Sequence, residues 1–330
     1  VGALDGKRGL IRGWTRLPPI PSVSGCRRRL SCTRPNSTVR LLPVKLDRRS
    51  FVSTLVAAGV VRSTGAREGP SAGPRFGLVT YLWGQDWNLP TLIRNCEEVG
   101  LAGVEVRVGH AHGIEPTLPR SAREEVRRRF ADSPVECVGY GSNQEYHSPD
   151  SAVLERNIRE TYELIRLCHD IGALGVKVKP NALPPEVPVE RTIEQIAGAL
   201  DRIGAFAADY DQKVRLEIHG RETSRIPVIR RIAEQISSPQ VGLCWNCNAV
   251  DLESPGLEDN FRSVRPFFAD TLHVHELDRG DYPYPALFRL LRETSYGGWI
   301  LFEGNDPPDK DRLSALRRQV ELMRTLWAEA

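Results

Sequence analysis

Apolar residues recur along this 330-residue chain in two alternating patterns. From about Arg75 onward, short runs rich in Val, Ile and Leu alternate with longer segments whose apolar residues lie three and four positions apart. The first pattern is typical of buried strands and the second of amphipathic helices. The expected strands are 75–83, 102–108, 135–141, 174–180, 213–220, 240–246, 270–277 and 298–304. The expected helices are 89–100, 120–130, 151–172, 190–210, 224–236, 256–268, 284–295 and 311–330.

Eight strand–helix units in strict alternation predict a (β/α)8 TIM barrel, formed as a single domain by residues 67–330. A doubly wound open sheet is the rival architecture, and it would carry a glycine-rich ligand fingerprint near a switch point. Neither G-x-G-x-x-G nor G-x-x-x-x-G-K-[ST] follows any of the expected strands. The pattern therefore favours the barrel.

The segment before the barrel has a different character. Residues 1–43 are rich in Arg and Pro without periodicity, and we interpret them as a non-structured or misannotated extension. Residues 44–66 contain Arg48-Arg49, a short apolar stretch over 51–61 and small residues that end at Ala66. This order is typical of a twin-arginine-type signal peptide, and the apolar stretch is too short to span a bilayer. We expect an exported, periplasmic protein, or a cytoplasmic one if the signal is spurious.

The net charge of +3 hides an asymmetry between these two parts. Residues 1–66 carry 13 Lys/Arg and 2 Asp/Glu, whereas residues 67–330 carry 32 Lys/Arg and 40 Asp/Glu. A net negative barrel argues against nucleic acid as its partner. The seven cysteines are odd in number, and the five in the barrel segment fall mostly within expected strands and helices. We therefore expect buried thiols and no disulfide framework.

Polar residues mark the ends of the last four expected strands. Catalytic groups of TIM barrels lie at the C-terminal ends of the strands, and these ends all lie on one face of the barrel. Strand 213–220 carries Glu217, strand 240–246 ends at Asn246, strand 270–277 carries His273, and strand 298–304 carries Glu303. Two carboxylates, one amide and one imidazole, without a thiolate, suit one divalent ion such as Mn²⁺, Mg²⁺, Co²⁺ or Zn²⁺.

Further polar and aromatic residues occur at the same edge, and we expect them to contact a substrate. A flat ring can stack on the apolar face of a sugar, although each aromatic residue alone could equally serve the core. The candidate substrate contacts are Trp83, His110, His219, Trp245, Asn248, His275, Glu276 and Arg279.

Taken together, these residues resemble the xylose isomerase-like TIM barrel superfamily. This superfamily contains sugar isomerases and epimerases and also the endonuclease IV-type enzymes (AP endonuclease family 2). Residues 213–304 are most similar to ketose 3-epimerases. The resemblance implies one metal ion held by Glu217, His273 and Glu303, with Asn246 where the family has an aspartate. In HVHELDR (273–279) it implies a ligand role for His273 and a substrate contact for Arg279.

The resemblance also implies a reaction on a small sugar or keto-sugar. A metal-dependent isomerase or epimerase would abstract a proton next to a carbonyl and form an enediolate, with Glu217 and Glu303 as the acid–base pair. A 3-keto-sugar lyase or hydratase would begin with the same step. A non-catalytic carbohydrate-binding barrel and an endonuclease-like protein are further alternatives. Stable membrane insertion is not expected, and a homo-oligomer is compatible with the sequence.

Overall fold

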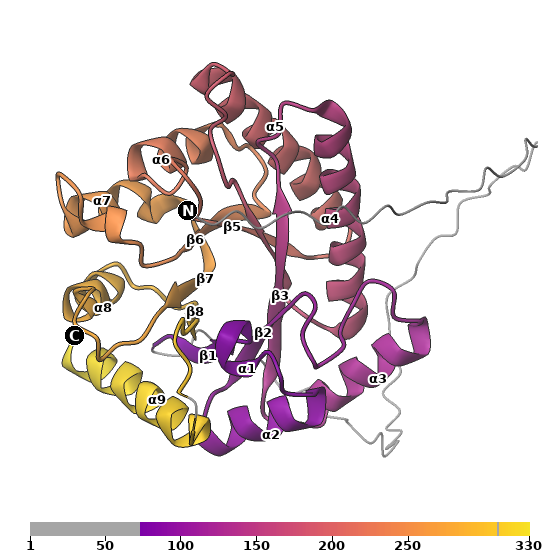
Figure 1. Cartoon of the computed structure of the whole chain (residues 1–330), viewed down its shortest axis with the longest axis vertical. Helices are drawn as coiled ribbons and strands as arrows, with labels where there is room; N and C mark the ends of the chain where they lie inside the picture. Colours follow the sequence, from indigo (N-terminus) through magenta and orange to yellow (C-terminus); the bar gives the residue numbers. More distant parts are fainter. Residues whose placement is uncertain (1–72, 309) are drawn as a thin grey trace, which may run out of the picture. The chain divides into compact units, whose positions relative to one another are not determined.

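The computed structural model describes residues 73–308 and 310–330, which form a closed eight-stranded barrel surrounded by helices (Figure 1). Strand order around the barrel is β1 to β8, every neighbouring pair is parallel, and β1 closes the ring against β8. The predicted (β/α)8 fold is confirmed. The extension and the signal peptide that we predicted at 1–43 and 44–66 lie outside the described residues, and they remain predictions.

The strands are short, and most have five residues. They are β1 (Arg75–Val79), β2 (Gly103–Arg107), β3 (Glu136–Glu145), β4 (Gly175–Lys179), β5 (Lys213–Glu217), β6 (Val241–Trp245), β7 (Phe268–Val274) and β8 (Trp299–Phe302). The helices are α1 (Tyr81–Gly84), α2 (Leu89–Val99), α3 (Arg120–Ala131), α4 (Ser151–Ile171), α5 (Val189–Ala208), α6 (Ile226–Gln235), α7 (Leu257–Val264), α8 (Tyr284–Glu293) and α9 (Arg312–Glu329). Two short 3₁₀ helices, η1 (Ala249–Leu252) and η2 (Arg265–Phe267), flank α7.

Local signals in the sequence set several of the helix ends. The side chain of Asn88 accepts a hydrogen bond from the backbone N–H of Thr91 and caps α2, and Asp150 caps α4 in the same way. These caps satisfy N–H groups that have no partner within the helix. Both helices end at a glycine in the left-handed conformation, Gly100 with φ 77° and Gly172 with φ 78°. Such glycines stop a helix without the steric penalty of a Cβ atom.

The barrel has an apolar outer layer, and its interior combines an apolar cluster of Val79, Val138, Trp299 and Leu301 with buried charges. Apolar side chains fill the space between strands and helices, whereas Glu105, Lys177 and Arg215 are fully buried on the strands. The Arg215 guanidinium pairs with Asp270 at 2.8 and 2.9 Å and also donates to the carbonyl of Val138. Buried charges of this kind require partners, and these contacts link β3, β5 and β7 across the barrel.

A glycine on β3 makes room for this arginine. A Cβ atom added to Gly139 would lie 2.3 Å from Nη1 of Arg215 and 2.9 Å from the backbone oxygen of Gly175. Any side chain at this position would therefore displace the buried ion pair or separate β3 from β4. The glycine supports the interior on which the site is built.

The observed elements differ from the predicted ones mainly at their ends. The strand predicted over 75–83 stops at Val79, because the apolar residues that follow form α1 and bury Trp83 against the core. The third strand continues to Glu145, which pairs with Lys179 on β4 after a shift in register. His275 and Glu276, predicted on a strand, follow the end of β7.

The five cysteines of the described part are free and buried, which confirms the expectation from the sequence for those residues. Among the helices of residues 73–308 and 310–330, none is both long and apolar enough to cross a membrane.

Candidate active site

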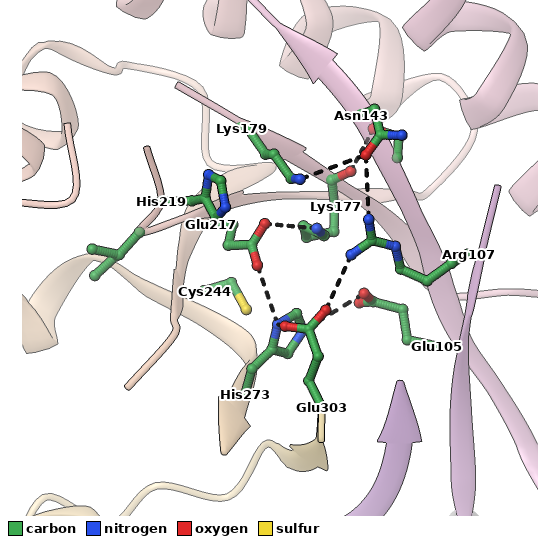
Figure 2. A network of polar contacts seen from close by, with 12 residues as sticks. Glu105, Arg107, Asn143, Lys177, Lys179, Glu217, His219, Cys244, His273 and Glu303 are labelled. Carbon is green, nitrogen blue, oxygen red and sulfur yellow. Dashed lines mark hydrogen bonds and ion pairs between the residues drawn. The ribbon is translucent and has the colours of Figure 1, made fainter. Parts of the chain in front are cut away.

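Three of the four predicted metal ligands lie together at the C-terminal ends of β5, β7 and β8 (Figure 2). Nδ1 of His273 is 3.1 Å from Oε2 of Glu303 and 3.4 Å from Oε1 of Glu217. All three residues are buried, with exposed fractions of 0% for His273, 5% for Glu303 and 1% for Glu217. Parallel strands bring these ends to one edge of the barrel, although the residues are far apart in the sequence.

Each carboxylate uses its second oxygen to bind a buried cation. Nζ of Lys177 on β4 is 2.6 Å from Oε2 of Glu217, and Nη1 of Arg107 on β2 is 3.0 Å from Oε1 of Glu303. The cations therefore hold the outer oxygens and leave the inner oxygens facing His273. Gly141 gives Arg107 this position, since a Cβ atom there would lie 2.8 Å from its Cδ.

A third carboxylate, Glu105 on β2, lies on the other side of the His273 ring. Its Oε1 is 3.6 Å from Nε2 of His273, and neither oxygen of Glu105 has a hydrogen-bond partner among the described residues. A carboxylate at this nitrogen favours a proton on Nε2. Nδ1, which forms a hydrogen bond to Glu303 at 3.1 Å, is then the nitrogen that would bind an ion in place of its proton. Glu105 is thus placed to orient the imidazole.

The electrostatics of the cluster follow from these contacts. Burial raises the pKa of Glu217, but Lys177 and His273 lower it by more, so the pKa lies well below its ordinary value. Burial also raises the pKa of Glu303, but His273 lowers it by more, and the resulting pKa is about 2. Burial lowers the pKa of His273, yet the neighbouring Cys244, Glu303 and Glu105 raise it well above its ordinary value. Both carboxylates are therefore ionised at neutral pH.

The cluster has the geometry and the donor set of a divalent-cation site. Ligands bound at about 2.1 Å to one ion are separated by roughly 3.0 to 3.4 Å, which matches the two distances around Nδ1 of His273. Asn246, which directly follows β6, is buried, and its Oδ1 has no hydrogen-bond partner within the described part of the chain. An orphaned carbonyl oxygen at this strand end is a candidate for a fourth ligand.

The other residues of the predicted HVHELDR motif have partners of their own. Nδ1 of His275 donates to the backbone oxygen of Glu303 at 2.8 Å, and the backbone N–H of His275 donates to the hydroxyl of Tyr284. Arg279 is partly exposed and pairs with Asp306 at 2.6 Å. These contacts join the segment after β7 to the segment after β8.

Glu276 and Trp83 form a buried pair beside this segment. Oε1 of Glu276 accepts hydrogen bonds from Nε1 of Trp83 at 3.3 Å and from the N–H of Asp306 at 2.7 Å. The indole also packs edge-on against Phe302, with ring centroids 5.0 Å apart. Trp83 is 2% exposed, so its ring is part of the core. The sequence had suggested a substrate contact for this residue.

Trp245 and Asn248 also have structural contacts where substrate contacts were predicted. Trp245 is fully buried and packs against Phe261 of α7 and Phe268 of β7, because its side chain points to the outer face of β6. The side-chain amide of Asn248 donates to the carbonyl of Ile218 at 2.7 Å and ties η1 to the end of β5.

His219 and His110 are half-buried near the strand ends. Nδ1 of His219 is 3.1 Å from Oδ1 of Asn181, and Nδ1 of His110 is 3.0 Å from the hydroxyl of Thr80. Burial lowers the pKa of both imidazoles, so they are mainly neutral at pH 7. Figure 2 shows His219 beside Glu217 and Lys179.

Glu105, Arg107 and Asn143 were missed as site residues. A signal for two of them was present, since Glu105 and Arg107 alternate on one face of GVEVR, a strand that is otherwise apolar. Charged residues in a buried parallel strand require a partner inside the barrel. Asn143 has no comparable signal, because β3 runs four residues further than the pattern predicted.

Known proteins share this architecture. Residues 93–326 match the family model described as xylose isomerase-like TIM barrel, so the chain belongs to this family. Similar solved structures include a 3-keto-D-glucoside 4-epimerase from E. coli, with 16% identity, a TM-score of 0.65 and coverage of 76% of this chain and 99% of that one.

A D-psicose 3-epimerase crystallised in the presence of D-fructose has 14% identity and a TM-score of 0.67, with 77% and 99% of the two chains covered. The IolI protein with a zinc atom has 13% identity, a TM-score of 0.65 and coverage of 77% and 98%. At such identities the likeness establishes the fold.

Proposed function

We propose that this protein is a divalent-metal-dependent sugar isomerase or epimerase. The observation that carries the proposal is the buried group of Glu217, His273 and Glu303, in which two carboxylate oxygens face one imidazole nitrogen at 3.4 and 3.1 Å. The family and the epimerases among the similar structures support the same class of reaction. The ligands suit Mn²⁺, Mg²⁺, Co²⁺ or Zn²⁺.

Glu217, His273, Glu303 and the amide oxygen of Asn246 would hold the ion. When bound, it would polarise a substrate carbonyl and acidify the adjacent C–H bond. Glu217 would remove that proton. In an isomerase Glu217 would return it to the neighbouring carbon, and in an epimerase Glu303 would first take a proton from solvent and deliver it to the opposite face of the substrate. Lys177 and Arg107 keep both carboxylates ionised before the reaction, and they lie next to the negative charge that develops on the substrate.

Four residues around this centre remain candidates for substrate contact. His219 and His110 are half-buried and His275 follows β7 directly, so each can offer one ring nitrogen to a hydroxyl group. Arg279 would need to exchange its surface pair with Asp306 for a substrate oxygen.

A test of this function is metal analysis combined with exchange of solvent deuterium into ketoses. The purified protein should contain a stoichiometric transition metal or gain one from Mn²⁺ or Co²⁺, and it should catalyse exchange. Glu217→Gln and Glu303→Gln should each abolish exchange, whereas Glu234→Gln, on the exposed face of α6, should not change it. Protein without metal and without exchange, but with sugar affinity, would instead be a carbohydrate-binding barrel.

A further inference from the structure

Three cationic side chains gather on the side of the barrel mouth formed by β2, β3 and β4 (Figure 2). Arg107 is the last residue of β2, and Lys177 and Lys179 belong to β4. Nη2 of Arg107 and Nζ of Lys179 both donate to Oδ1 of Asn143, at 3.2 and 3.5 Å. A single amide oxygen therefore lies between two cations. It cannot balance their charge, because an amide is neutral.

Lys179 differs from the other two cations in its partners. Arg107 and Lys177 each form a short ion pair with one carboxylate of the candidate metal site. Among the described residues, no carboxylate lies within ion-pairing distance of Lys179. Burial lowers the pKa of Lys179, and the nearby charges of Lys177 and Arg107 lower it further. Glu217 and Glu303 oppose this shift from beyond ion-pairing distance, so Lys179 has two cationic neighbours and no close carboxylate partner of its own.

The charges immediately around the candidate metal site point in the same direction. Three carboxylates surround the candidate site, and the three cations balance them while His273 is neutral. The carboxylates are Glu105, Glu217 and Glu303. A divalent ion at the site would therefore leave a buried net positive charge. Such a charge is costly unless an anion accompanies it.

We propose that the mouth binds an anionic group of the substrate through Lys179 and Arg107, and that the substrate is a sugar acid. This proposal rests on the proposed function and specifies its substrate class. Arg107 contacts the Glu303 carboxylate directly, so the anionic group lies within a few atoms of the reacting carbon. A carboxylate one or two carbons from that carbon meets this requirement, as in a keto-aldonate.

A carboxylate fits the surroundings better than a phosphate. Phosphate sites in α/β proteins use backbone N–H groups of a glycine-rich loop at a helix N-terminus. Helix α5, which follows β4, begins ten positions after Lys179, behind a segment with four prolines and no glycine. The donors at the mouth are a guanidinium and an ammonium group, which bind carboxylate and phosphate alike, so it is the lack of a glycine-rich loop here that favours the carboxylate.

The experiment compares two ketoses of the same chain length, D-fructose and 2-keto-D-gluconate, by titration calorimetry with protein loaded with Mn²⁺ and with protein treated with a chelator. Fructose 6-phosphate is the third ligand. We expect the keto acid to bind at least tenfold more tightly than either fructose or its phosphate. The preference over fructose should be largest with Mn²⁺, which adds positive charge to the mouth, and part of it should persist after chelation, since Lys179 and Arg107 belong to the protein.

The variant Lys179→Met should reduce the preference for the keto acid about tenfold, and Lys179→Arg should retain most of it. Lys213→Met, at the exposed beginning of β5 and the opposite end of the barrel, is the matched control and should behave as the wild type. Equal affinities for fructose and the keto acid, tighter binding of the phosphate, or an unchanged preference in Lys179→Met would each overturn the proposal.

The two proposals fail in different ways. Binding of the keto acid that depends on Lys179, without deuterium exchange into any sugar, would support the anion site and reject the proposed function. Exchange into neutral ketoses, without affinity for the keto acid, would support the function and overturn the anion site.

Discussion

The ammonium group of Lys177 lies 2.6 Å from Oε2 of Glu217, and both side chains are almost completely buried. They come from neighbouring strands, β4 and β5, and point into the barrel. Because a buried carboxylate without a partner is strongly destabilising, this pair determines both the stability of the interior and the ionisation of the candidate base.

Replacement of Lys177 by Met should destabilise the fold by about 3 to 5 kcal/mol, since it leaves Glu217 charged and unpaired in the interior. The double variant Lys177→Met/Glu217→Gln should recover part of this loss. Urea denaturation of the single and double variants gives the coupling energy. Lys213→Met should stay within about 0.5 kcal/mol of the wild type. A coupling energy below about 0.5 kcal/mol between Lys177 and Glu217 would show that the two residues do not stabilise each other.

Replacement of Glu105 by Gln should weaken metal binding roughly 10- to 100-fold, because the imidazole of His273 loses the carboxylate that orients it and raises its basicity. Competition with a chelating dye measures the affinity. Glu234→Gln serves as the control on the surface. An unchanged affinity in a folded Glu105→Gln protein would remove Glu105 from the site.

Replacement of Asn246 by Asp should tighten the binding of Mn²⁺ by on the order of tenfold, because an anionic oxygen replaces a neutral one at the ligand position. Replacement by Leu should weaken it. The two variants are informative together, since a fourth ligand must respond in opposite directions to the two changes. Equal Mn²⁺ affinity in both, measured by calorimetry, would contradict coordination by Asn246.

The carboxyl group of Asp251 should make stability depend on pH. Burial raises its pKa from 3.8 to about 7, against the opposing hydrogen bonds from Tyr282 and Asn248. The folded state therefore retains a proton that the unfolded chain loses near pH 4. This stabilisation is complete below pH 4 and is lost as the pH rises through 7.

Asp251→Asn cannot lose that proton. Its free energy of unfolding relative to the wild type should rise between pH 4 and pH 8 by up to about 4 kcal/mol. Urea denaturation at several pH values measures the difference, and Asp259→Asn, on the exposed face of α7, is the control. Parallel pH profiles of the wild type and Asp251→Asn would show that the carboxyl group is not perturbed.

The sequence alone determined the eight strand–helix units and the strand ends on which Glu217, His273 and Glu303 lie. Local patterns suffice here, because apolar spacing, caps and glycines act over a few residues. The same reasoning brought these three residues to one edge, since all parallel strands of a barrel end on the same side.

Only the tertiary structure decided which charges meet. Arg107 and Glu303 are 196 positions apart, and they form an ion pair because β1 closes the barrel against β8 and brings β2 near it. Closure likewise places Glu105 behind His273. Distances across the interior depend on how all eight strands close around it, and no local pattern in the sequence determines these distances.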